Sequence, residues 1–160
     1  MDEIAIAPVT LNNLAMLDSA LRQLAAELGD NYQTDPATLA TAVCGPATSC
    51  LALLASRDGR PLAAALASPV FSTIQGGAGL YVSDLWVAAE ARGLGLARRL
   101  LAEILREGER RQVGRFLKLT VYQDNAGARA VYDRLGFTAS TGETNMLLNG
   151  AALKTLRDKI

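Results

Sequence analysis

The feature that most restricts the fold is a glycine-containing junction between an apolar segment and a long amphipathic one. Residues 79–87 (Gly-Leu-Tyr-Val-Ser-Asp-Leu-Trp-Val) have the composition of a central β-strand. Leucines and an isoleucine then recur at three- and four-residue spacing, which predicts a helix over about 95–112. Gly93 and Gly95 lie between the two and allow a tight backbone turn. The junction therefore predicts a strand–turn–helix unit in a chain of mixed helices and strands.

The same junction has the chemistry of an anion-binding turn. A helix start offers unpaired N–H groups and a positive dipole end, and Arg92 adds a planar cation suited to phosphate oxygens. The dinucleotide-binding fingerprint does not fit, because the sixth position counted from Gly93 is Arg98. The nucleoside-triphosphate loop does not fit either, since Gly-Lys-Ser/Thr is absent. The alternative is a glycine-rich turn that begins a helix and binds nothing.

The remaining segments predict the order β-α-α-β-β-β-α-β-α-β in one domain, since 160 residues suffice for one core. Such an order is typical of an α/β or α+β fold, with a mixed sheet and helices on both faces. Arg57-Asp58-Gly59-Arg60 predicts a hairpin turn, and Thr10 and Asp35 predict helix caps. The other predicted strands are 3–9, 49–56, 61–71, 115–122 and 143–148, and the other helices are 11–28, 35–43, 125–135 and a short tail.

Composition narrows the chemistry. The chain has no histidine, which excludes Ser-His-Asp and Cys-His hydrolases and most zinc enzymes, so we expect no metal. Cys44 and Cys50 are too few for a disulfide framework and are expected to be small, buried or half-buried thiols. The acidic start, Met1-Asp2-Glu3, is unlike a signal peptide, and no apolar run is long enough to span a membrane. We therefore expect a cytoplasmic location.

The net charge of zero hides an asymmetry between the two halves of the chain. Residues 1–84 carry eight acidic and three basic side chains, whereas residues 85–160 carry eight acidic and thirteen basic ones. The basic half is suited to an anionic ligand and the acidic half to a cationic one. The alternative is that the arginines simply cover solvated helix faces.

Two motifs carry a resemblance to a known family. Residues 92–97 (Arg-Gly-Leu-Gly-Leu-Ala) match the pattern Arg/Gln-x-x-Gly-x-Gly/Ala, and the second motif is Asn125-x-x-Ala128-x-x-x-Tyr132-x-x-x-Gly136-Phe137. With the strand 79–87 before them, the chain resembles the Gcn5-related N-acetyltransferases (GNAT) over about 79–137. Residues 81–87 look most like the diamine and thialysine acetyltransferase branch, which typically has Glu-Asp where Ser83-Asp84 stands here.

The resemblance implies a GNAT fold and a mechanism. The sheet is expected to be mixed and mostly antiparallel, with strands 79–87 and 115–122 splayed apart around acetyl-CoA, the acyl donor. An amide near Leu85 would polarise the thioester carbonyl, and the amine would attack directly, without a covalent acyl-enzyme. Asn125 would contact the pantetheine arm, and Tyr132 would lie near the sulfur. The implied acetyl-CoA-binding residues are Leu85, Val87, Arg92, Gly93, Leu94, Gly95, Leu96, Ala97, Asn125 and Tyr132.

The implied catalytic residues are Tyr132, Asp84 and Leu85. A phenol near the leaving thiolate can protonate it, although Tyr132 also has the spacing of an apolar helix face and is then a core residue. Asp84 is a candidate general base because a carboxylate inside a strand is unusual, and a bulge there would turn it toward the acceptor. The alternatives are a structural role for Asp84, a water relay through Ser83, or Glu143 as the base.

The acceptor is expected to be a small cationic amine, such as a polyamine or an amino-acid-like amine. The alternatives are a protein or peptide N-acetyltransferase and a non-catalytic sensor that binds acetyl-CoA. Aromatic residues are few and not interleaved with basic ones, so we expect neither nucleic acid nor a membrane as partner. A homodimer is expected, paired through sheet edges or the strand 143–148. Three arginines have two open interpretations, either contact with the 3′-phosphate of CoA or a solvated helix face: Arg98, Arg99 and Arg129.

Overall fold

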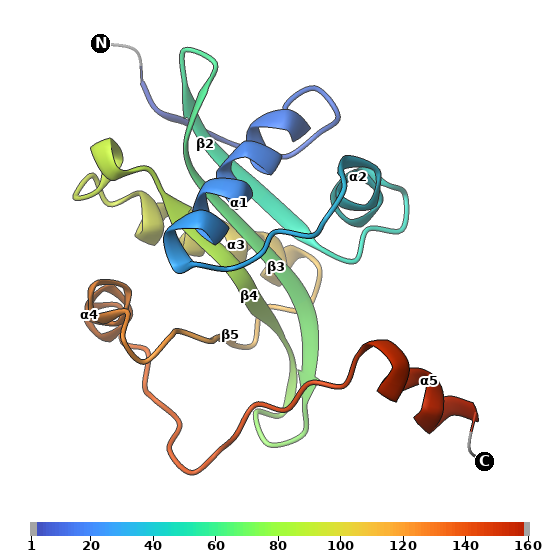
Figure 1. Ribbon diagram of the computed structural model, residues 1–160. Coiled ribbons are helices and arrows are strands. Elements are labelled where there is room, and N and C mark those ends of the chain that lie inside the picture. Colours follow the sequence, from blue (N-terminus) through green and yellow to red (C-terminus); the bar gives the residue numbers. More distant parts are fainter. Residues whose placement is uncertain (1–2, 159–160) are drawn as a thin grey trace. The chain divides into compact units, whose positions relative to one another are not determined.

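The computed structural model describes residues 3–158, so Met1 and Asp2 of the acidic start lie outside the described residues (Figure 1). The chain divides into two compact units, one ending at Tyr122 and one beginning at Gln123, and each is described by itself. The first unit contains β1 (Ala5–Pro8), α1 (Leu14–Leu28), α2 (Pro36–Cys44), β2 (Leu51–Arg57), β3 (Arg60–Ser72), β4 (Gly77–Val87), the short 3₁₀ helix η1 (Ala89–Ala91), α3 (Leu96–Arg110) and β5 (Leu117–Leu119). The second unit contains α4 (Ala126–Arg134) and α5 (Gly150–Asp158).

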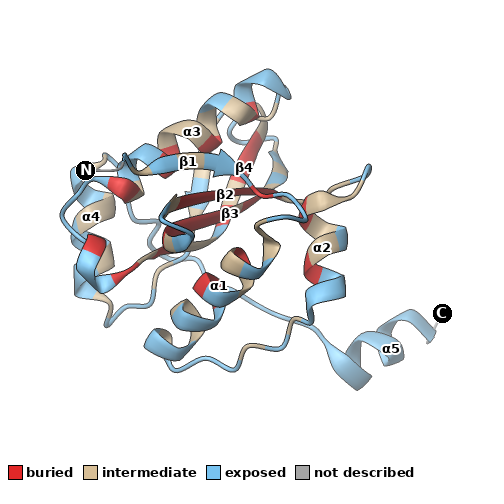
Figure 2. Ribbon diagram, turned by 90° about the horizontal axis from the view of Figure 1, so that it is seen from above, coloured by how far each residue is buried: buried red, intermediate tan, exposed pale blue. Residues whose placement is uncertain are grey.

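The first unit is a five-stranded sheet covered by helices on both faces. The strands lie in the order β1-β2-β3-β4-β5; neighbours from β1 to β4 are antiparallel, and β5 runs parallel to β4. Figure 2 shows α3 on one face of the sheet and α1 and α2 on the other. This arrangement confirms the predicted mixed, mostly antiparallel sheet.

The core explains why the central strands are apolar without alternation. Both faces of β2 and β3 are covered, so consecutive residues are buried, including all of 51–55 and 62–65. Several of these residues are alanines, whose methyl groups let the covering helices approach the backbone. Four of the five residues of the predicted apolar stripe of α3, at 96, 100, 101 and 104, are buried, and the fifth, Leu105, is half-buried.

Three of the local predictions can be compared directly with the structure. Asp58 and Gly59 both have positive φ angles, 52° and 72°, as the predicted hairpin turn requires. The Asp35 side chain accepts a hydrogen bond from the Thr38 N–H at 2.9 Å and caps α2 as predicted. The prediction that Thr10 caps a helix from residue 11 is wrong. Helix α1 begins at Leu14 with Asn13 as its N-cap. Thr10 closes a turn before the helix, in which its hydroxyl accepts from the Asn12 N–H at 3.3 Å and its own N–H donates to Asn13 Oδ1 at 2.7 Å.

Two strand predictions need correction. The strand predicted over 115–122 is regular only at Leu117–Leu119, and the strand predicted over 143–148 does not form within the described residues. Residues 143–148 have no hydrogen-bonded strand partner there, and an unpaired segment has no reason to adopt strand geometry. The apolar side chains of Met146 and Leu147 are consequently exposed. The helical tail is confirmed as α5, whereas the homodimer stays a prediction without this strand to support it.

Candidate functional site

The centre of the candidate site is the place where β4 and β5 separate. The two strands pair only from Leu80–Leu117 to Val82–Leu119, although β4 continues to Val87. On its other edge β4 stays paired with β3 as far as Val87. Within the described residues, 83–87 therefore have a strand partner on one edge only, which agrees with the predicted splay and leaves backbone groups for a ligand.

A bulge in β4 begins at the same point. Leu66 lies opposite Asp84 and Ala67 opposite Val82, so Ser83 is the extra residue. The Ser83 hydroxyl lies 2.7 Å from Asp84 Oδ2, to which it donates a hydrogen bond, and 3.3 Å from the Leu66 carbonyl oxygen. A bulge changes the direction in which the neighbouring side chains point. The sequence analysis expected such a bulge to turn Asp84 toward the acceptor, and the bulge itself is present.

Burial raises the pKa of Asp84 above its ordinary value, and the hydrogen bond from Ser83 opposes that shift only in part. A carboxyl group with a raised pKa accepts a proton more readily than an ordinary one. This property is the one that a general base for an amine requires. Asp84 therefore remains the candidate general base. Ser83 donates a hydrogen bond to it.

Sequence reasoning missed a polar cluster at α1, formed by Asp18, Arg22 and Tyr32. The Tyr32 hydroxyl donates to Asp18 Oδ1 at 2.9 Å, and the Arg22 guanidinium lies 4.6 Å from the centre of the Tyr32 ring. Arg22 Nε also lies 2.7 Å from Asp18 Oδ2. Burial, with the Asp18 hydrogen bond, raises the pKa of Tyr32 to about 12, and the negative charge of Asp84 adds a smaller effect. The four-residue spacing of Asp18 and Arg22 on α1 was the only feature of the sequence that indicated it.

The turn after β4 has the geometry predicted for an anion site. Gly93 and Gly95 have φ angles of 84° and 73°, in the left-handed region that favours glycine. A Cβ atom added to either glycine would meet no atom within 4 Å, so open space lies over this backbone. Gly95 is the N-cap of α3 and no side chain caps the helix, which leaves its first N–H groups to solvent or to a ligand.

Arg92 is held by the protein itself. Its Nε donates to the Val87 carbonyl oxygen at 3.2 Å, and its Nη2 lies 2.7 Å from Glu27 Oε2. Glu27 Oε1 also accepts a hydrogen bond from Trp86 Nε1 at 3.2 Å. The sequence gave no indication of these contacts, because Glu27 is 65 residues from Arg92. A direct contact of Arg92 with phosphate stays a prediction.

The second unit contains the other two predicted site residues. Asn125 is the N-cap of α4, and its Oδ1 accepts a hydrogen bond from the Ala128 N–H at 3.1 Å. The Tyr132 ring packs edge-on against Phe137, with ring centres 5.6 Å apart. Burial raises the pKa of Tyr132 above its ordinary value of 10.0, and the phenol is protonated at neutral pH, as a proton donor must be. The contacts of both residues with acetyl-CoA stay predictions.

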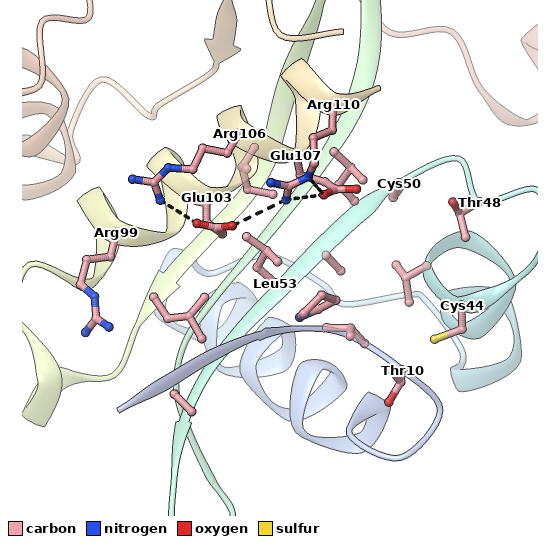
Figure 3. A pocket seen from close by; sticks show the side chains of 18 of the residues that line it. Thr10, Cys44, Thr48, Cys50, Leu53, Arg99, Glu103, Arg106, Glu107 and Arg110 are labelled. Atoms are coloured by element: carbon pink, nitrogen blue, oxygen red, sulfur yellow. Dashed lines mark hydrogen bonds and ion pairs between the residues drawn. The ribbon is translucent and has the colours of Figure 1, made fainter. Parts of the chain in front are cut away.

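A hollow of the first unit lies away from these residues. A groove of about 1280 Å³ is lined by residues of β1, β2 and α3 (Figure 3). It contains none of the predicted catalytic residues, but Arg98 and Arg99, two of the candidate contacts of the CoA 3′-phosphate, are part of its lining. Glu103 and Glu107 pair with Arg106 and Arg110 at 2.7 and 2.6 Å, so the charges along its α3 wall compensate one another. Arg99 Nη2 reaches the Ile4 carbonyl oxygen at 3.4 Å.

Within residues 3–158 the structure has neither a metal-binding cluster nor a membrane-spanning helix. No group of three or more Cys, Asp or Glu side chains there is arranged to hold a metal ion. No helix in that range is both long enough and apolar enough to cross a membrane. Cys44 and Cys50 are free and half-buried, as predicted.

One family model and two curated relatives that match this chain are named for acetyl transfer. The profile of the family described as Acetyltransferase (GNAT) family matches residues 17–137. The 5-NmdU N-acetyltransferase of Pseudomonas phage PaMx11 is 42% identical over 72 residues, which are 45% of this chain and 46% of that protein. N-alpha-acetyltransferase 40 of Saccharomyces cerevisiae is 38% identical over 69 residues, 39% of this chain and 24% of that protein. The chain thus spans less than half the length of these two relatives.

Among solved structures, an integron cassette protein from the mobile metagenome of V. cholerae is similar to this chain with a TM-score of 0.76. The two share 18% sequence identity, and the match covers 99% of each chain. This likeness shows the fold alone.

The raised pKa of Asp84 predicts a pH-dependent stability difference. The carboxylate is disfavoured in the folded protein, so its burial costs stability above the raised pKa, and the cost disappears below the ordinary value of 3.8. Asp84→Asn should therefore unfold at higher temperature than the unchanged protein at pH 7, and the difference should shrink as the pH falls toward 3.8. Thermal unfolding at several pH values measures this. Asp58→Asn, at the exposed hairpin turn, is the control for loss of one negative charge, and a pH-independent difference for Asp84→Asn would contradict the prediction.

Proposed function

The chain belongs to the acetyltransferase (GNAT) family, and we propose that it transfers the acetyl group of acetyl-CoA to the amine of a small cationic molecule. Members of this family use acetyl-CoA as the acyl donor. The observation that carries the proposal is the continuity of the site. The unpaired edge of β4 at 83–87 leads directly into the left-handed turn at Gly93 and Gly95 and the uncapped start of α3.

The proposed donor site follows this path along the backbone. The pantetheine arm would pair with the edge of β4, with the amide near Leu85 at the thioester carbonyl and Val87 beside the arm. The pyrophosphate would lie over the turn, where the absence of Cβ atoms and the helix start favour an anion. From the second unit Asn125 would add a contact to the arm. The amides at the turn and helix start belong to Gly93, Leu94, Gly95, Leu96 and Ala97.

The proposed chemistry is a direct transfer between two molecules held side by side. The lone pair of the neutral amine forms the new N–C bond, and the C–S bond of the thioester breaks. An amine loses a proton in this reaction, and Asp84 would accept it, directly or through water. The departing thiolate gains a proton, and Tyr132 would donate it. An amide donor at the carbonyl oxygen stabilises the negative charge that develops there.

One acid group, Asp84, supports a cationic acceptor, because the charge of nearby Asp18 is already paired with Arg22 at 2.7 Å. Asp84 lies on the bulged part of β4, and its negative charge acts on Tyr32, which is hydrogen-bonded to Asp18. A cationic amine would be attracted to this side of the sheet before it loses its proton. The diamine-like sequence at 81–87 supports the same class of acceptor.

A protein or peptide N-terminus is the second candidate acceptor, and it is favoured by the similarity to N-alpha-acetyltransferase 40. A thiol-release assay with acetyl-CoA and a panel of polyamines, amino acids and peptides decides between these acceptors. We expect the polyamines or amino-acid-like amines to give the highest kcat/KM. Binding of acetyl-CoA without thiol release on any amine would instead indicate a non-catalytic sensor.

Gly95→Ala should weaken binding of CoA by roughly tenfold or more, because the variant puts a methyl group over the turn and strains a left-handed position. Calorimetric titration of the folded variant measures the affinity. Gly59→Ala is the matched control, because Gly59 has nearly the same φ angle and equally open space at the hairpin turn. Equal affinities in both variants would place the pyrophosphate elsewhere.

Tyr132→Phe should lower kcat by roughly 100-fold, the usual scale for a positioned acid, with little change in the affinity for acetyl-CoA. The ring and its contact with Phe137 are kept, so folding should not suffer. Steady-state kinetics with the best amine provide the measurement. Tyr81→Phe, which removes a hydroxyl bonded to Thr120 at 3.3 Å, serves as the control. Unchanged turnover in Tyr132→Phe would make Tyr132 a packing residue.

Asp84→Asn should raise KM for a cationic acceptor by roughly tenfold, because a charge-assisted contact is lost. If Asp84 is also the base, kcat should fall, and the fall should shrink as the pH approaches the pKa of the amine. Kinetics over a range of pH separate the two effects, with Asp58→Asn as the control. Wild-type values of both constants would remove Asp84 from both roles.

A further inference from the structure

One carboxylate connects a helix on one face of the sheet to the candidate pyrophosphate turn. Glu27 lies in the last turn of α1, which packs against β3 and β4. Its two oxygens have different partners: Oε1 accepts from Trp86 Nε1 at 3.2 Å, and Oε2 lies 2.7 Å from Arg92 Nη2. Glu27 thereby joins α1, the end of β4 and the first residue of the turn.

The position of Glu27 is electrostatically unfavourable for the helix itself. A helix C-terminus carries partial negative charge, and the last turn of α1 contains no basic residue that would offset a carboxylate. The Trp86 N–H group and the Arg92 guanidinium therefore provide the hydrogen bonds and the positive charge that stabilise the Glu27 carboxylate. Trp86 is only 2% exposed, so its N–H group needs an acceptor within the protein, and Glu27 provides it.

Arg92, like Glu27, binds two partners from different parts of the chain. Its Nε is bound to the Val87 carbonyl oxygen and its Nη2 to Glu27, so the guanidinium spans the corner between β4 and the turn. Gly93 and Gly95 follow directly with left-handed φ angles. Glycine backbone of this kind has many accessible conformations, and contacts from outside the turn reduce their number.

We propose that Glu27 is a positioning residue that, through Arg92 and Trp86, holds the turn 92–95 in the conformation that binds the pyrophosphate of CoA. This inference rests on the proposed function. It gives Arg92 a role through the backbone and not as a direct phosphate ligand. It also makes the C-terminal end of α1 part of the donor site.

The test compares Glu27→Gln with Glu90→Gln in calorimetric titrations with CoA and with acetyl-pantetheine, which lacks the pyrophosphate. Glutamine keeps an oxygen for Trp86 and loses the charge that holds Arg92. Glu90 is an exposed acid on η1, so its variant controls for the loss of one negative charge near the turn. Glu27→Gln should raise the Kd for CoA by roughly fivefold or more, with acetyl-pantetheine unaffected. Glu90→Gln should not raise it.

A double-mutant cycle with Arg92→Gln completes the design. If Glu27 and Arg92 act as one unit, Arg92→Gln should weaken CoA binding in the unchanged protein and add little in the Glu27→Gln background. Tighter CoA binding by Glu27→Gln would show that Glu27 competes with phosphate for Arg92, which overturns the proposal. Unchanged binding would overturn it as well, since exposed ion pairs often contribute little. Two results with the unchanged protein would contradict the proposed donor site itself: equal affinity for acetyl-pantetheine and CoA, or no binding of either. The inference about Glu27 would then fall together with the proposed function.

Discussion

The hydrogen bonding of β4 to β5 stops at Val82, and the candidate site depends on that limit. A strand paired on both edges has no backbone groups left for a ligand, whereas β4 beyond Val82 is paired with β3 alone. The bulge at Ser83 adds the second requirement, because it changes the direction of the side chains just where the pairing stops. This single interruption of the sheet leaves one edge of β4 unpaired at Asp84, Leu85 and Val87, as their candidate roles require.

Local sequence patterns predicted most of the first unit because the relevant information is short-range. The stripe of α3, the cap at Asp35 and the Asp58-Gly59 turn each depend on residues within four positions of one another. The strand at 143–148 was predicted in the same way and is wrong, since a strand also needs a partner that lies far away in the sequence. The start of α1 was predicted three residues too early, because the Thr10 hydroxyl accepts the Asn12 N–H in a turn that precedes the helix.

The candidate site was predicted less completely than the fold. The glycines of the turn could be recognised because a left-handed conformation limits the residue type. The bonds that hold the turn could not be recognised, because Glu27, Trp86 and Arg92 are brought together only by the packing of α1 on the sheet. The Asp18–Tyr32 pair was missed because its two residues are 14 positions apart, beyond the three- and four-residue spacing by which contacts along a helix are recognised.

The uncapped first turn of α3 would connect the stability of the protein to the supply of the anion that is proposed to bind there. Most helices satisfy their first N–H groups with a Ser, Thr, Asp or Asn side chain, and here Gly95 cannot do so. An anion that completes this turn binds the folded chain and not the unfolded one, so it stabilises the fold by mass action. At a free concentration 100 times its Kd, such a ligand adds about 2.7 kcal/mol, a large part of the stability of an ordinary domain. In a cell depleted of the ligand, the same chain would unfold and be degraded more readily, so its abundance would follow the level of the molecule that it binds.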